Sequence, residues 1–287
     1  MFTNFIKKLK QTNVSRLIIF FVMLFYSATM LYAVGWVVLA SLKDHSELLL
    51  ENMNGLPRKW LFSNFAKAFE YFGDSNTSFV GMFINSIWFS VGSALLSGFV
   101  TSISAYIFTK FEFKGKKLIF TIFMIAMLLP MYGNFPATYK LTQNLGFYNS
   151  PLYIIVGAAG YGNTMLIMMG SFEVLSWEYA EAAEIDGAND YYIFFRIMFP
   201  LIKPAFIALS LVGVIGAWNN YMTPIIYLPD MPTLAAGLYI FKDRMQYSMN
   251  LPAYFAGVVL SFIPTLALFI IFRETIMENV AVGGIKG

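Results

Sequence analysis

Long runs without any charged residue recur along this chain, and they constrain its fold more than any other feature. About 20 apolar residues are enough for a helix to cross the hydrocarbon core of a bilayer. Runs of at least that length are Leu17–Leu42, Ser75–Thr109, Leu118–Tyr139, Leu141–Phe172, Pro204–Pro229 and Met245–Phe272. Charged residues make up only 12% of the chain, about half the usual share for a soluble domain. The sequence therefore predicts an all-α integral membrane protein.

Each run is long enough for one transmembrane helix and part of a loop, so we expect six. The expected spans are 17–42, 80–108, 118–138, 151–171, 204–227 and 253–272. None of them contains Asp, Glu, Lys or Arg. Because all charges fall between or beyond the spans, we interpret residues 1–287 as a single transmembrane domain.

The distribution of basic residues predicts the orientation. With the N-terminus in the cytoplasm, twelve of the nineteen Lys and Arg residues lie on the cytoplasmic side, as the positive-inside rule favours. Both termini are then expected in the cytoplasm. The first run is not interpreted as a cleaved signal peptide, because it exceeds the apolar core of about 7–15 residues that such a peptide has.

The residues that most active sites need are scarce in this sequence. Cysteine is absent, which excludes thiolate chemistry, and the single histidine, His45, is expected in a solvated loop. No nucleotide-binding loop, zinc motif or Ser-His-Asp set occurs, and a net charge of +3 gives no support for nucleic-acid binding. We expect no catalytic residue and no metal site in this chain, so any ATP-driven work would need an ATPase on another chain.

One predicted cytoplasmic segment, Ser171–Lys203, is too long and too acidic for an ordinary connection. The stretch Trp177–Ala188 is rich in Ala and Glu, which are good helix formers, and Ser176 is suited to cap its start. We expect a short helix there and a turn at Gly187. The alternative is an amphipathic linker on the membrane surface, although such a helix normally carries Lys and Arg on its polar face.

A second short helix is expected over Tyr191–Phe199, leading back to the membrane. Pro200 and Pro204 fit the first turn of the next span, where proline is tolerated.

This segment reads Glu181-Ala182-Ala183-Glu184-Ile185-Asp186-Gly187, then nine residues, then Ile197-Met198-Phe199-Pro200. It resembles the EAA signature of the inner-membrane subunits of binding-protein-dependent ABC importers, with Phe199 in place of the usual Leu. Three further stretches resemble the carbohydrate branch of that family, related to the second maltose permease. They are Tyr139–Ser150, the cluster Ala217–Tyr221 and the tail Ala281–Gly287.

The resemblance implies the type I importer permease fold and a set of partners. These are a second permease subunit, two ATP-binding subunits that hold ATP and Mg, an extracellular binding protein and a sugar, with this chain in the bacterial or archaeal cell membrane. No cofactor is expected in this chain. The resemblance assigns a coupling role toward the ATPase to Glu181, Ala182, Ala183, Asp186 and Gly187.

Polar and aromatic residues within the spans are candidates for the substrate path, because such residues are costly in lipid. The candidates are Trp218, Asn219, Asn220, Tyr221, Asn85, Tyr132 and Asn134. The alternative is that they form hydrogen bonds between helices and contact no sugar.

Other functions would need other residues. The same branch includes importers of glycerol phosphates, for which cationic residues in the path would be expected. A self-sufficient secondary transporter would need intramembrane carboxylates or histidines, and an intramembrane enzyme would need buried catalytic groups. The spans contain neither set.

Overall fold

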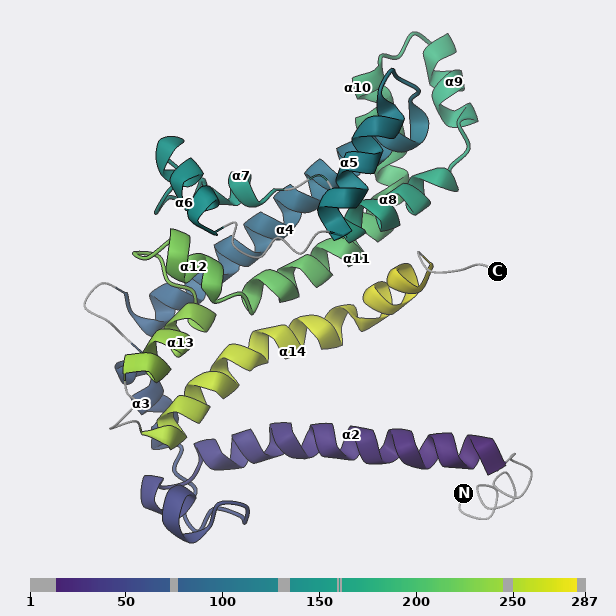
Figure 1. Ribbon diagram of the computed structural model, residues 1–287. Coiled ribbons are helices and arrows are strands. Elements are labelled where there is room, and N and C mark those ends of the chain that lie inside the picture. The colour runs from purple at the N-terminus through teal and green to yellow at the C-terminus, as the bar shows by residue number, and fades with distance from the viewer. Residues whose placement is uncertain are drawn as a thin grey trace. The chain divides into compact units, whose positions relative to one another are not determined.

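The computed structural model describes residues 14–72, 77–128, 135–158, 160, 162–244 and 250–282, and every regular element among them is a helix (Figure 1). The elements are α2 (Val14–Ser41), η1 (Glu47–Glu51), α3 (Ser63–Tyr71), α4 (Phe79–Lys110), α5 (Lys116–Leu128), α6 (Phe135–Asn144), α7 (Tyr153–Gly157), α8 (Asn163–Glu173), α9 (Glu178–Ile185), α10 (Asp190–Tyr192), η2 (Ile193–Met198), α11 (Phe199–Trp218), α12 (Met222–Tyr227), α13 (Leu234–Arg244) and α14 (Leu251–Val282). The prediction of an all-α chain is confirmed.

The chain forms two compact units. The first contains the residues up to Tyr71 and residues 245–260, and the second contains residues 72–244 and 261–287. Helix α14 begins in the first unit and continues into the second.

Four helical stretches of the described residues are long and apolar enough to cross a membrane. They are Val14–Ser41, Phe79–Lys110, Asp190–Trp218 and Leu251–Thr275, and they overlap the predicted spans 17–42, 80–108, 204–227 and 253–272. The predicted span 118–138 includes residues 129–134, which lie outside the described part. The count of six transmembrane helices therefore stays a prediction.

Two expected spans are interrupted instead of continuous. In 151–171, α7 ends at Gly157 and α8 begins at Asn163, with Gly162 between them at a φ of 104°. A Cβ on Gly160 would overlap Ser104 Oγ of α4, so a glycine is required for this close approach. In 204–227, α11 ends at Trp218 and α12 begins at Met222. At membrane depth, irregular backbone is tolerated only inside protein or beside a water-filled cavity.

The helix expected over Tyr191–Phe199 is present as α10 and η2, and it continues into α11 without a break. Residues Asp190–Trp218 form one continuous helical stretch of 29 residues. Pro200 lies in the first turn of α11, as predicted, whereas Pro204 lies inside that helix. Proline lacks the N–H of the helical ladder, and its ring collides with the carbonyl four residues earlier. The π-helical turn η2 ends immediately before Phe199, and its backbone hydrogen bonds span five residues instead of four. This wider turn relieves the conflict at Pro200.

The second unit is built around α4, against which α8 and α11 pack. Small residues allow the close approach of α11. A Cβ on Gly213 would lie 3.2 Å from Ala94 Cβ, and one on Gly98 would lie 3.0 Å from Ser210 Oγ. Small residues at helix contacts are typical of membrane proteins, where packing rather than water exclusion drives association.

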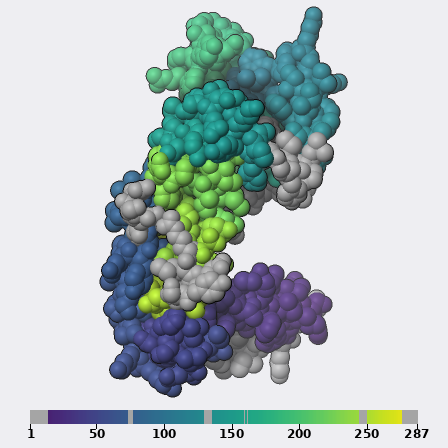
Figure 2. Space-filling model, turned by 60° about the vertical axis from the view of Figure 1, so that its left-hand side comes forward, coloured from purple at the N-terminus to yellow at the C-terminus, as the bar shows by residue number. Residues whose placement is uncertain are grey.

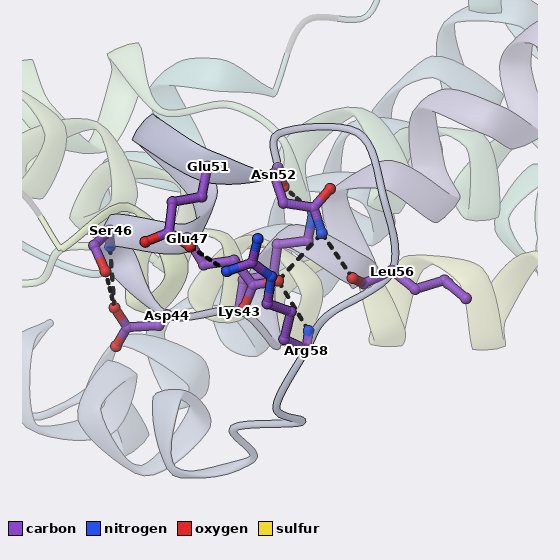
Figure 3. Close-up of polar contacts among 8 residues, drawn as sticks. All are labelled: Lys43, Asp44, Ser46, Glu47, Glu51, Asn52, Leu56 and Arg58. Atoms are coloured by element: carbon purple, nitrogen blue, oxygen red, sulfur yellow. Dashed lines mark hydrogen bonds and ion pairs between the residues drawn. The ribbon is translucent and has the colours of Figure 1, made fainter.

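In the first unit, the loop after α2 is held together by polar groups (Figure 3). Lys43 is 1% exposed, and its Nζ donates to the carbonyls of Asn52 (2.6 Å) and Met53 (3.1 Å). Glu47 Oε1 accepts hydrogen bonds from Asn52 Nδ2 (3.3 Å) and from the backbone N–H of Arg58 (2.9 Å). Burying a charged group is costly unless it is hydrogen-bonded, and these bonds tie Lys43 and Glu47 to the loop's own backbone and side chains.

Candidate functional site

The segment with the EAA signature folds as a helix, a tight turn and a second helix. Ser176 Oγ accepts a hydrogen bond from the N–H of Glu178 (3.2 Å), the first residue of α9, although the N-cap residue is Trp177 and not the predicted Ser176. At its end, the N–H of Ala188 donates to the carbonyl of Ala183 (2.9 Å), and that of Gly187 to Glu184 (3.0 Å). This pair of bonds is a Schellman motif.

Gly187 occupies the left-handed position of that motif, with a φ of 83°. Glycine adopts this conformation without the steric cost that a Cβ imposes. Directly after it, Asn189 Oδ1 accepts from the N–H of Tyr192 (2.9 Å) and caps the next helix. The turn predicted at Gly187 is therefore present, and its two caps define the angle between α9 and the long helix that follows.

The two faces of α9 have different surroundings. Ala180 (0% exposed) and Ala183 (9%) are buried in a cluster that includes Ile193, Phe194 and Met198. Of the five predicted coupling residues, Ala183 thus packs inside its own chain. The other four, Glu181, Ala182, Asp186 and Gly187, are exposed.

The exposed face of α9 carries an apolar stripe that sequence reasoning missed. Tyr179 is 55% exposed and Ile185 is 87% exposed, with the exposed Ala182 between them. We call Tyr179, Ala182 and Ile185 the docking stripe. Their spacing of three residues, offset from the buried Ala180 and Ala183, is the signal that a helical projection of the sequence contains. The stripe lies among exposed carboxylates, namely Glu178, Glu181, Glu184 and Asp186.

The segment is anchored to the end of α4. Lys110 Nζ donates to the carbonyl of Leu175 (2.6 Å), and the rings of Phe111 and Trp177 meet edge to face at 6.0 Å. The Tyr106 ring lies 5.4 Å from that of Phe172 and 5.0 Å from that of Phe194. Packed side chains therefore connect the segment around α9 with α4, α8 and η2, and close-packed interiors are stiff.

The substrate-path candidates fall into two groups. Three of them make internal bonds. Asn85 donates to the Pro232 carbonyl (3.1 Å) and accepts from Trp88 Nε1 (3.1 Å). Trp218, which is 5% exposed, donates to the Ser261 carbonyl (3.0 Å). Asn220 and Thr223 bond reciprocally at the start of α12 (2.9 and 3.1 Å).

The second group is exposed where α11 is interrupted. Asn219 donates to the Ile215 carbonyl (2.8 Å), but its side chain is accessible. Tyr221 is also exposed, and its ring stacks on Tyr239 of α13 with centroids 4.7 Å apart. Sequence reasoning missed Tyr239, because it lies outside every predicted span. Tyr132 and Asn134 lie outside the described residues.

Comparison with known proteins supplies the family. Residues 97–277, which include the EAA segment and the interruption after Trp218, match the model of the binding-protein-dependent transport system inner membrane component. This chain belongs to that family. The family's description places its members in the inner membrane, and the resemblance on which the sequence analysis relied is thereby confirmed.

Individual members of the permease family match nearly the whole chain. The arabinooligosaccharides transport system permease protein AraQ of Bacillus subtilis is 30% identical over 94% of this chain and 95% of its own length. The diacetylchitobiose uptake system permease protein NgcG of Streptomyces coelicolor is 27% identical over 91% and 86%. Among solved structures, a bacterial ABC transporter involved in the import of alginate matches with a TM-score of 0.74 and 21% identity, over 92% of this chain and 98% of that one. That likeness concerns the fold.

Proposed function

We propose that this permease is one of two membrane subunits of an ATP-driven importer, and that the imported solute is a carbohydrate, an oligosaccharide in particular. The observation that carries the proposal is the EAA segment itself. It combines an anchored inner face with an exposed face of apolar and acidic side chains. A subunit that receives force from a soluble ATPase needs such a rigid projection. The carbohydrate assignment is supported by the names of AraQ and NgcG.

In this proposal the docking stripe and Glu181 contact one of two ATP-binding subunits. Those subunits bind ATP and Mg, and this chain contributes no covalent chemistry. Closure of the ATPase pair moves α9, and the anchored core transmits the movement to α4 and α11. The path then opens outward, where a binding protein delivers the sugar, and ATP hydrolysis returns it to the inward state. Both chain termini would lie in the cytoplasm.

The path itself would run past the interruption between α11 and α12. Discontinuous helices are typical of transporter substrate sites, because they expose polar groups at membrane depth. Asn219 and Tyr221 are the accessible side chains there, and an amide beside an aromatic ring suits a sugar. This region would be held in place by the internal hydrogen bonds of Asn85, Trp218 and Asn220.

A glycerol phosphate is a second candidate solute. A doubly charged phosphate would need Lys or Arg in the path, and no predicted span contains either residue. A second permease subunit could supply that charge, so the choice between sugar and phosphate depends on the transport assay. A secondary transporter, which would work without ATP, is the candidate from a different class.

The first test is purification of the tagged protein from its native membrane, with mass spectrometry of the proteins that accompany it. We expect a second permease and an ATP-binding protein. The ATP-binding protein should be lost in the double variant Glu181→Lys/Ile185→Asp, while the second permease stays bound. A chain that purifies alone and transports solute in liposomes without ATP would overturn the proposal in favour of a secondary transporter.

A further inference from the structure

A pocket lies between α9 and the long helix that follows it. Its volume is about 530 Å³, and its lining includes Asp186, Gly187, Asn189, Tyr192 and Arg196. The surrounding segment, α9 with the turn and α10, lies at the surface, at the top of the space-filling view (Figure 2). Two of these residues, Asp186 and Gly187, are also predicted coupling residues, so a protein seated on α9 would cover the rim of the pocket.

Arg196 gives the pocket its chemical character. It is exposed, and its guanidinium makes no ion pair with a carboxylate among the described residues. An arginine side chain is permanently charged and presents donors in a planar fork that fits a carboxylate. Arg196 also lies in the π-type turn η2, a deviation from α-helix that is frequent at functional sites.

The charges around the pocket favour a side chain on a protein over a free anion. Asp186 lines the same pocket, and its carboxylate offsets the charge of Arg196, so the pocket has little net attraction for a dissolved ion. A carboxylate held in place by a docked protein does not need that net attraction, because docking supplies a high local concentration.

The rest of the loop indicates why one such contact is useful. Exposed carboxylates at Glu178, Glu181, Glu184 and Asp190 favour a basic partner surface. Attraction between an acidic helix and a basic cleft does not by itself fix the position of the helix along the cleft. A single acidic group on the partner that must meet Arg196 would fix the register of docking, since any other position leaves like charges together.

We propose that this pocket receives an acidic side chain of the ATP-binding subunit, with Arg196 as its partner. This inference rests on the proposed function and deepens it. The docking stripe provides apolar contact on one side of α9, and the pocket provides an oriented ion pair on the other.

The test compares Arg196→Glu with Arg196→Lys in the full complex, with all subunits co-expressed. We measure the ATP-binding subunit recovered per tagged permease and binding-protein-stimulated ATP hydrolysis. Arg196→Glu should reduce recovery about tenfold or more, because charge reversal at a docked ion pair is strongly unfavourable. With Arg196→Lys, recovery should stay within about threefold of that of the unmodified chain. Lysine keeps the positive charge and loses only the planar arrangement of hydrogen-bond donors. Lys203→Glu, the same charge change on the same helix outside the pocket lining, is the matched control.

The contact can also be trapped directly, because the chain contains no cysteine. A single cysteine in place of Ala188, which lines the pocket, should form a disulfide with a cysteine at the matching acidic position of the ATP-binding subunit. An acid-to-lysine change at that position should restore recovery in Arg196→Glu. Recovery of the second permease controls for folding in every variant.

Three outcomes distinguish the possibilities. Full recovery of the ATP-binding subunit with Arg196→Glu, while Ile185→Asp abolishes it, would overturn the pocket proposal and leave the proposed function intact. Stabilisation of the purified permease by inorganic phosphate, lost in Arg196→Gln without any change in recovery, would assign the pocket to a free anion instead. Failure of the unmodified chain to recover any ATP-binding subunit would overturn both proposals.

Discussion

The two segments that are richest in described polar contacts or charges, the loop after α2 and the EAA segment, use their charged residues in opposite ways. In the first, Lys43 and Glu47 are buried and bonded to the loop's own backbone and side chains. In the second, the buried contacts are apolar and the carboxylates are exposed. Polar groups that hold a fold together are not available to a partner. The comparison teaches that the first loop uses its charges within its own fold, whereas the EAA segment leaves its carboxylates exposed, as the proposed docking of an ATP-binding subunit requires.

The largest expected effect is at Gly187, where the turn geometry and the proposed partner contact coincide. Gly187→Asp should abolish more than about 90% of uptake of the sugar carried by the co-purified binding protein, while membrane insertion survives. The left-handed φ costs a residue with a Cβ about 1 kcal/mol, and a new carboxylate lies beside Asp186. Uptake and ATP hydrolysis are measured together in proteoliposomes.

Gly187→Asn separates the two causes, since Asn tolerates the left-handed conformation and adds no charge. It should retain more uptake than Gly187→Asp. Equal losses would assign the effect to the added side-chain atoms and not to the charge. Normal uptake by Gly187→Asp would count against a coupling role for this turn.

Lys43→Met tests the role of the buried charges in the loop after α2. It should lower the free energy of unfolding by about 2–3 kcal/mol, because the carbonyl acceptors of Asn52 and Met53 lose their donor. ATP hydrolysis per folded complex should stay unchanged. Thermal unfolding in detergent measures the loss of stability. The control is Lys59→Met, at an exposed position of the same loop. Reduced hydrolysis at unchanged stability would show that this loop also serves coupling.

The sequence was most informative where one physical signal dominates. Charge-free runs identified the four helical stretches that are long and apolar enough to cross a membrane, and the turn at Gly187 followed from local backbone chemistry. The interruption around Gly160 was not foreseen, and the close approach of Gly160 to Ser104 joins positions more than fifty residues apart. The Tyr221–Tyr239 stack and the bonds of Asn85 and Trp218 also join distant segments. Hydropathy carries no information about such contacts.

Ala180 is buried and Ala182 is exposed, so the same substitution at each position compares the two faces of α9. Ala180→Leu should destabilise the complex by about 1–3 kcal/mol, because three added carbons have no room in a packed cluster. Ala182→Leu adds the same atoms on the exposed face, so stability should hold while recovery of the ATP-binding subunit falls. Thermal unfolding and co-purification of both variants give the two readings. A reversed pattern would mean that the faces of α9 are wrongly assigned.

The smallest expected effect concerns Asp44, an exposed carboxyl in the first loop. Hydrogen bonds from the Ser46 hydroxyl (2.7 Å) and then from the Ser46 backbone N–H (3.0 Å) lower the pKa of Asp44 below its ordinary value of 3.8. A carboxyl whose pKa is lower in the folded state stabilises the fold above the ordinary pKa, and this contribution is lost as the pH falls through the lowered value. Ser46→Ala removes the larger cause, so the difference in unfolding temperature between the two proteins should be small at pH 6 and vanish by about pH 2. A difference that persists at low pH would mean that Ser46 acts through packing, and the loop would then depend on more than its polar bonds.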